Sequence, residues 1–213
     1  MPASSHVTTP KDIRQAASAL EGVAVRTNLE RSERLSAEAG VDILLKREDQ
    51  QKCRSFKVRG AYVRMAKLSE EEKKRGVVAA SAGNHAQGVA LAADRLGIKA
   101  RIYMPLGAAL PKITATRDHG AEVELHGVTV DEALAEAKRY AEETGAVFVH
   151  PFDNEDIIAG QGTIGLEILE QVPDVDTVIV GVGGGGLLAG LSAAIRAKEQ
   201  KLGKKIKIIG VQA

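Results

Sequence analysis

Short apolar segments alternate with longer segments that have apolar residues at helical spacing along most of the chain. The apolar segments, which predict strands, are residues 76–81, 99–105, 121–127, 146–152, 176–182 and 204–213. The longer segments, which predict helices, are residues 84–97, 109–120, 129–145, 154–172 and 183–201. Because the predicted strands are continuously apolar, the pattern favours an α/β fold whose parallel sheet is covered by helices on both faces.

The first third of the chain is less regular. A helix is predicted from Pro10 to residue 20, and a second helix opens at "SFKVRGAYVRMAKL" (55–68). Between them, "VDILLKRED" (41–49) is apolar and then charged, which predicts a buried strand that leads into a functional loop.

Composition excludes several classes of function. With 29 Lys and Arg against 28 Asp and Glu, no broad field attracts nucleic acid or an anionic membrane, and three Phe, three Tyr and no Trp make base stacking improbable. The single cysteine, Cys53, rules out internal disulfides and fits a reducing cytosol. No apolar run is long enough to span a bilayer, and the first 15 residues lack a signal-peptide core, so a cytoplasmic location is expected.

Four consecutive glycines, Gly183 to Gly186, stand between a predicted strand and a predicted helix. Bare backbone N–H groups at a helix N-terminus bind anions, phosphate above all. A flexible turn would need only one or two glycines, so the anion site is favoured. The dinucleotide pattern G-x-G-x-x-G is matched through Gly181, Gly183 and Gly186, but the acidic residue that should bind the ribose is missing.

Polar residues also follow the strand at 76–81. In "SAGNHAQG" (81–88), Ser81, Gly83 and Asn84 place a hydroxyl, free N–H groups and an amide where ligands of parallel sheets gather. A helix cap with a partly exposed His85 explains the same residues equally well.

Lys57 is the candidate catalytic residue. It follows Phe56 at a predicted helix start, where desolvation and the positive helix end should lower its pKa and leave the neutral amine that a Schiff base requires. Most such lysines are solvated. Here, however, the amine occurs together with a phosphate loop and a polar loop, a set of features that matches pyridoxal phosphate.

Four segments carry a family resemblance: "SFKVRGA" (55–61), "SAGNHAQGVA" (81–90), "VHPFDNEDIIAGQGTIGLEIL" (149–169) and "VGVGGGGLLAG" (180–190). They resemble the threonine dehydratases (threonine ammonia-lyases) of the tryptophan-synthase-β-like, fold type II family of pyridoxal phosphate enzymes, from about residue 20 to the last residue. The resemblance implies two open parallel or mixed sheets with helices on both faces. It also implies a large domain of residues 1–66 and 153–213, incomplete at its C-terminus, and a small domain of residues 67–152.

The resemblance implies a role for each site residue. Lys57 would form the Schiff base and act as the catalytic residue, with Phe56 packed beside the cofactor. Asn84 would bind the ring hydroxyl. The phosphate would be held by Gly183, Gly184, Gly185, Gly186 and Leu187. The substrate carboxylate would be bound by Ser81, Gly83, Asn84 and His85. No metal is implied.

The implied reaction is conversion of L-threonine to 2-oxobutanoate and ammonia through an aminoacrylate, with L-serine giving pyruvate, in a cytoplasmic enzyme of isoleucine biosynthesis. Partners are small-molecule substrates, with no nucleic acid or membrane, and a homo-oligomer at full length. Relatives that resemble serine racemase have a serine directly before Gly-Asn-His. The chain has Ala82 there, which favours elimination over racemisation.

Departures from the family pattern leave two alternatives open. Thr27-Asn28-Leu29 replaces the usual Thr-Pro-Leu, Gln50 replaces a common leucine, and the part that would face the pyridine nitrogen is missing. The chain would then be a truncated, non-catalytic fragment that needs its C-terminal part. The less favoured alternative is a nucleotide-binding oxidoreductase, which predicts no covalent link to Lys57.

Smaller signals indicate structural roles. Glu48 and Asp49 are expected in a salt-bridged loop, Cys53 as a buried thiol, and His150 with Asp153 in a pocket wall.

Overall fold

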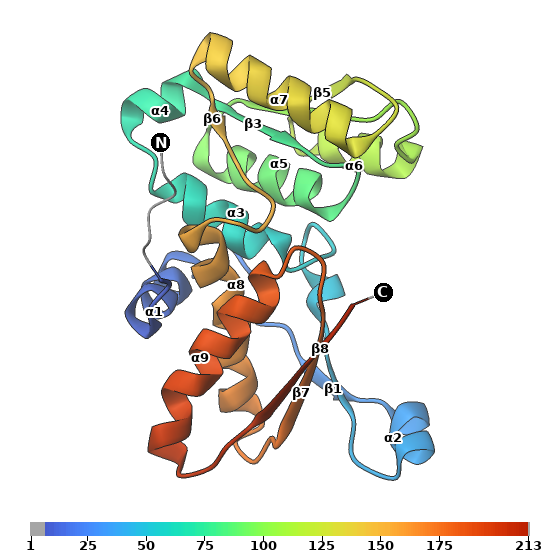
Figure 1. The fold of residues 1–213 in the computed structure, drawn as a ribbon, viewed down its shortest axis with the longest axis vertical. Helices are drawn as coiled ribbons and strands as arrows, with labels where there is room; N and C mark the ends of the chain where they lie inside the picture. Colours follow the sequence, from blue (N-terminus) through green and yellow to red (C-terminus); the bar gives the residue numbers. More distant parts are fainter. Residues whose placement is uncertain (1–6, 213) are drawn as a thin grey trace.

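The computed structural model describes residues 7–212, without the side chains of residues 200–202. A four-stranded sheet and a two-stranded sheet lie toward opposite ends of the long axis, with helices α3 (Lys57–Ala66) and α8 (Glu155–Gln171) between them (Figure 1). The predicted α/β class is confirmed.

The larger sheet is entirely parallel, with strand order β5-β4-β3-β6. Its strands are β3 (Val77–Ala80), β4 (Ala100–Met104), β5 (Glu122–Leu125) and β6 (Val147–Phe148). Alternate residues of β3 enter different clusters, Val77 and Ala79 on one face and Val78 and Ala80 on the other. Both faces of the central strands are therefore buried, as continuous apolar strands predict.

Helices cover each face of this sheet. The sheet helices are α5 (Asn84–Leu96), α6 (Leu110–Asp118) and α7 (Val130–Thr144), and the short α4 (Glu70–Arg75) precedes β3. Ala133 and Ala137 of α7 pack on one face, whereas α5 and α6 join the cluster on the other face, in agreement with their separation in Figure 1. The connection between β3 and α5, residues 81–83, lies at the carboxyl edge of the sheet.

A second group of elements packs around α8. They are α1 (Pro10–Ala19), α9 (Gly186–Leu202), β7 (Thr177–Gly181) and β8 (Lys207–Val211), with β7 parallel to β8. Val178 and Val180 are buried under α9, but Ile179 between them is 67% exposed. Within the described residues, α9 therefore covers β7 on one face. The last predicted strand residue, Ala213, lies outside those residues.

The segment 41–49 also differs from the prediction. It forms β2 (Leu44–Lys46), which pairs antiparallel with β1 (Leu29–Arg31), and the short helix α2 (Glu33–Ala39) connects the two strands. Leu44 and Leu45 are exposed, so this is not a buried strand. An apolar run of this length cannot by itself distinguish a core strand from a two-stranded ribbon. The single helical turn Glu48–Gln50 follows.

Glycines allow the central helices to approach closely. A Cβ added at Gly60 of α3 would lie 2.8 Å from the carbonyl oxygen of Ile157, and one at Gly160 of α8 would lie 2.6 Å from the Cα of Gly60. A Cβ at Gly88 of α5 would lie 2.9 Å from the backbone of Lys57. Because no side chain fits at these crossings, the backbones of α5, α3 and α8 are in direct contact.

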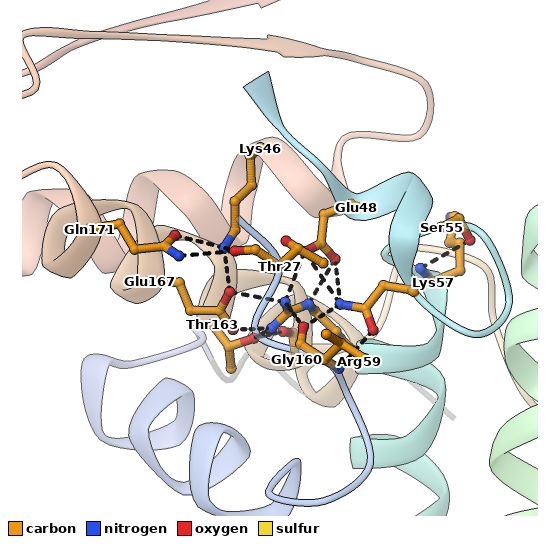
Figure 2. Close-up of polar contacts among 12 residues, drawn as sticks. Thr27, Lys46, Glu48, Ser55, Lys57, Arg59, Gly160, Thr163, Glu167 and Gln171 are labelled. Carbon is orange, nitrogen blue, oxygen red and sulfur yellow. Dashed lines mark hydrogen bonds and ion pairs between the residues drawn. The ribbon is translucent and has the colours of Figure 1, made fainter. Parts of the chain in front are cut away.

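A buried ionic network ties α3 to α8 and to the β1–β2 segment (Figure 2). Arg59, 1% exposed, pairs with Glu48 at 2.9 Å and with Glu167 at 2.6 Å, and it donates to the hydroxyl of Thr163 at 3.0 Å. Lys46 pairs with Glu167 at 2.6 Å. The expected salt bridge of Glu48 is confirmed, and Asp49 pairs with Arg47.

We predict that Arg59→Ala strongly destabilises the protein, because it leaves Glu48 and Glu167 without their buried partner. Removing one member of a buried ion pair lowers the free energy of unfolding by about 3–5 kcal/mol. Arg139→Ala is the control, since Arg139 pairs with Glu136 and Glu143 on an exposed helix face, and it should change stability little. Urea denaturation measures both variants. Equal stability of the two would contradict the structural role of the network.

A second buried titratable group lies on α5. His85 is 4% exposed, and its Nε2 lies 3.0 Å from the carbonyl oxygen of Val149, just after β6. Burial lowers the pKa of His85 to about 3, because its charged form would be desolvated. The imidazole is therefore neutral at physiological pH.

Stability should accordingly fall as the pH drops below the ordinary histidine pKa. The unfolded chain binds a proton at His85 near pH 6.5, whereas the folded chain does not do so until about pH 3. Above pH 6.5, neutral His85 makes its full contribution to the free energy of unfolding. Between pH 7 and pH 4, ~3 kcal/mol of that contribution should be lost. His85→Gln should flatten the pH dependence of urea unfolding over that range. A pH profile of His85→Gln identical to that of the wild type would rule out this assignment.

Candidate functional site

Lys57 is the first residue of α3, and its amine faces the segment that follows β6. The Nζ donates to the carbonyl oxygen of Pro151 at 2.7 Å and lies 5.5 Å from the centre of the Phe56 ring. Ser55 accepts a bond from the backbone N–H of Lys57 at 3.4 Å. The amine of Lys57 thus contacts a backbone carbonyl and an aromatic ring, whereas the amine of an exposed helix lysine contacts water.

Burial lowers the pKa of Lys57 below the 10.5 of a free lysine. The direction agrees with the sequence prediction, and desolvation of the ammonium form is its cause. A larger fraction of this amine is therefore neutral, and thus nucleophilic, than of an exposed lysine at the same pH.

The glycine loop supplies a set of free backbone donors. Among the described residues, none of the N–H groups from Gly183 to Leu188 donates to a protein acceptor, and the first such bond is from Ala189 to Gly185 at 2.9 Å. Gly185, with φ +86°, caps α9 in a left-handed conformation that side chains rarely adopt. These N–H groups and the positive end of the 17-residue helix α9 are the features that an anion would need at this position.

The amine and the N–H groups share one pocket of about 220 Å³. Its walls include Phe56, Lys57, Pro151, Phe152, Ile157, Gln161, Gly181, Gly183, Gly184, Gly185, Gly186, Leu187 and Leu188. A Cβ at Gly184 would lie 2.2 Å from the Phe152 ring, so only glycine leaves room for this aromatic wall. The segment 151–152 therefore contacts both the lysine amine and the glycine loop.

Seven of the sequence-predicted site residues line this pocket together: Phe56, Lys57, Gly183, Gly184, Gly185, Gly186 and Leu187. The predicted polar loop does not contribute to its lining. Ser81 accepts from the backbone N–H of Gly83 at 3.1 Å, Asn84 begins α5 and its Oδ1 accepts from Lys112 at 2.8 Å, and His85 is buried. Their predicted roles toward the ligand stay predictions.

Sequence reasoning missed several pocket residues: Pro151, Phe152, Ile157, Gln161 and Leu188. A signal for the first two was present, because "HPF" follows a predicted strand at the sheet edge where ligands bind. Gln161 carried a weaker signal, as an amide within the otherwise apolar "IIAGQGTIG" (157–165). Cys53 is buried as expected. No helix within residues 7–212 is long and apolar enough to cross a membrane.

The chemistry of the pocket fits pyridoxal phosphate. An aldehyde reacts with the neutral form of an amine, which burial favours at Lys57 by lowering its pKa, and a phosphate needs N–H donors, which the loop at 183–188 leaves free. Both groups face one cavity with aromatic walls, so one small molecule can contact them together.

Comparison with known proteins agrees with this pocket. Residues 20–213 match the family described as pyridoxal-phosphate dependent enzyme. An L-threonine ammonia-lyase of Thermotoga maritima is 57% identical over 96% of this chain and 50% of its own length. A catabolic L-threonine dehydratase of Escherichia coli is 46% identical over 95% of this chain and 60% of its own length. The chain thus spans about half to three-fifths of these relatives.

Solved structures of similar fold support the match. The processed form of threonine deaminase isoform 2 from Solanum lycopersicum has a TM-score of 0.86 and 43% identity, covering 97% of this chain and 58% of that one. Maize serine racemase has a TM-score of 0.91 and 36% identity, covering 96% of this chain and 61% of that one. The family match, the similar solved structures and the pocket together show that the chain belongs to the family of pyridoxal-phosphate dependent enzymes.

Proposed function

We propose that the protein of which this chain forms a part is a threonine ammonia-lyase, which converts L-threonine to 2-oxobutanoate and ammonia and L-serine to pyruvate. The observation that carries the proposal is the single pocket shared by the Lys57 amine and the free N–H groups at 183–188. The names of the two curated relatives, an L-threonine ammonia-lyase and an L-threonine dehydratase, support the choice of substrate.

The cofactor site in this proposal uses the residues that line the pocket. Gly183 to Gly186 and the N–H of Leu187 hold the phosphate, and Phe56 packs beside the ring. Pyridoxal phosphate supplies an aldehyde that an amine can attack and a ring that withdraws electrons from a bound amino acid. Asn84, at the start of α5, is proposed to bind the ring hydroxyl.

Lys57 has two tasks in the reaction. Its amine would hold the cofactor, and once the amine of the substrate has taken that place, Nζ of Lys57 would accept the α-proton. The carbonyl oxygen of Pro151, 2.7 Å from Nζ, orients the amine within the pocket. Apolar walls formed by Phe152 and Ile157 limit the access of water to that nitrogen.

The carboxylate of the amino acid is proposed to bind at the loop after β3, through Ser81, Gly83, Asn84 and His85. Backbone N–H groups here lie at the N-terminus of α5, whose dipole favours an anion. Neutral His85 cannot offer a full charge, so the N–H groups, the Ser81 hydroxyl and the Asn84 amide carry the recognition. Ala82 has no hydroxyl for proton exchange on the opposite face, which favours elimination over racemisation.

Further proposals concern the organisation of the protein. A small domain of residues 67–152 is supported by the four-stranded sheet, all of whose strands lie within that range. Residues 1–66 and 153–213 would form the large domain, of which residues 1–6 and 213 lie outside the described structure. Homo-oligomer formation and a cytoplasmic location stay predictions from the family resemblance.

The first experiment measures whether the chain captures its cofactor through Lys57. Purified protein with added pyridoxal phosphate should develop a visible band distinct from free cofactor. Borohydride reduction followed by peptide mass mapping should place the cofactor on Lys57. With L-threonine, 2-oxobutanoate should form, and Lys57→Ala should lower its rate by at least about 100-fold, because the proton acceptor is lost.

Lys57→Ala also provides the decisive control. If it keeps the band and the trapped adduct, the covalent site lies elsewhere and the proposal fails. If wild-type chain captures cofactor on Lys57 but releases no 2-oxobutanoate from L-threonine, the cofactor site stands and the lyase activity is overturned for this chain.

A further inference from the structure

The side-chain oxygen of Gln161 is a buried polar atom without a hydrogen-bond partner in the described part of the chain. The residue is 2% exposed, and its Oε1 has no hydrogen-bond partner among the described residues, the only buried side-chain atom of that part of the chain in this condition. Burying an unpaired amide oxygen is unfavourable, and methionine or leucine would fill a similar volume without that cost. A polar partner supplied by a bound molecule would remove the cost.

The position of Gln161 relates it to the Lys57 pocket. It lies one helical turn after Ile157 on α8, and both residues line the pocket. A Cβ at Gly60 would lie only 2.6 Å from Nε2 of Gln161. Gly60 is itself one turn after Lys57 on α3, so the missing side chain at position 60 makes room for the amide beside the helix that carries the amine.

The lining of the pocket indicates which molecule satisfies the amide. The pocket contains the amine and the N–H groups that fit an aldehyde and a phosphate, whereas Ser81, Gly83 and His85, which are proposed to bind only the substrate, do not line it. The amide therefore faces the cofactor side of the site. We propose that Oε1 of Gln161 accepts a hydrogen bond from bound pyridoxal phosphate and that Gln161 is a cofactor-binding residue. This inference rests on the proposed function.

The test compares wild type, Gln161→Met and Gln161→Leu, each stripped of cofactor and titrated with pyridoxal phosphate. Loss of one buried hydrogen bond should weaken cofactor binding by about tenfold. Thermal unfolding of the cofactor-free variants should show a midpoint equal to or above that of wild type, because an unpaired polar group has been removed. Leu166→Met, also on α8 but in the cluster with α1, should change neither quantity.

The outcomes separate this inference from the function on which it rests. Three results would overturn the role of Gln161 while the cofactor is still trapped on Lys57 of the wild type. They are a cofactor affinity of both variants within twofold of wild type, an effect on L-threonine binding alone, and failure of both apolar variants to fold. Absence of cofactor capture by wild type would overturn both. Weaker cofactor binding with undiminished stability supports the inference, since a purely structural amide would show the reverse.

Discussion

The packing of four helices through glycine is the constraint on which the rest of the structure depends. Gly88 brings α5 against α3, Gly60 and Gly160 bring α3 against α8, and Gly190 brings α9 against α8, where an added Cβ would lie 2.4 Å from the carbonyl oxygen of Ile158. Glycine inside a helix costs about 1 kcal/mol relative to alanine. That cost is offset by backbone contact and by the buried Arg59 network, which holds the same pair of helices, α3 and α8, together.

The close helix packing determines what the pocket contains. The start of α3 carries Lys57, the start of α9 carries the free N–H groups, and the segment before α8 carries Pro151 and Phe152. A larger side chain at a helix crossing would move these three chain segments apart. The electrostatics of the site follow from the same arrangement: burial lowers the pKa of the lysine, and the aligned peptides of α9 favour an anion a short distance away.

Sequence reasoning was most successful where chemistry is local. Lys57 beside Phe56, and four glycines before a helix, each indicate a function through the properties of adjacent residues, and the structure places both in one pocket. Sequence reasoning was wrong where the burial of a residue depends on segments that are distant along the chain. Leu44 and Leu45 resemble core residues but lie on an exposed two-stranded ribbon. Hydrophobicity alone does not report which face of a strand another element covers.

The sequence by itself therefore determined the alternation of strands and helices, the parallel sheet, the candidate amine and the anion loop, because periodicity and backbone freedom are properties of short segments. Only the tertiary structure decided that the carbonyl of Pro151 meets Lys57, that Phe152 lies against Gly184, and that Gln161 is buried without a partner. These contacts join residues about 30 to 100 positions apart, and they depend on helix crossings whose spacing is set by the absence of side chains.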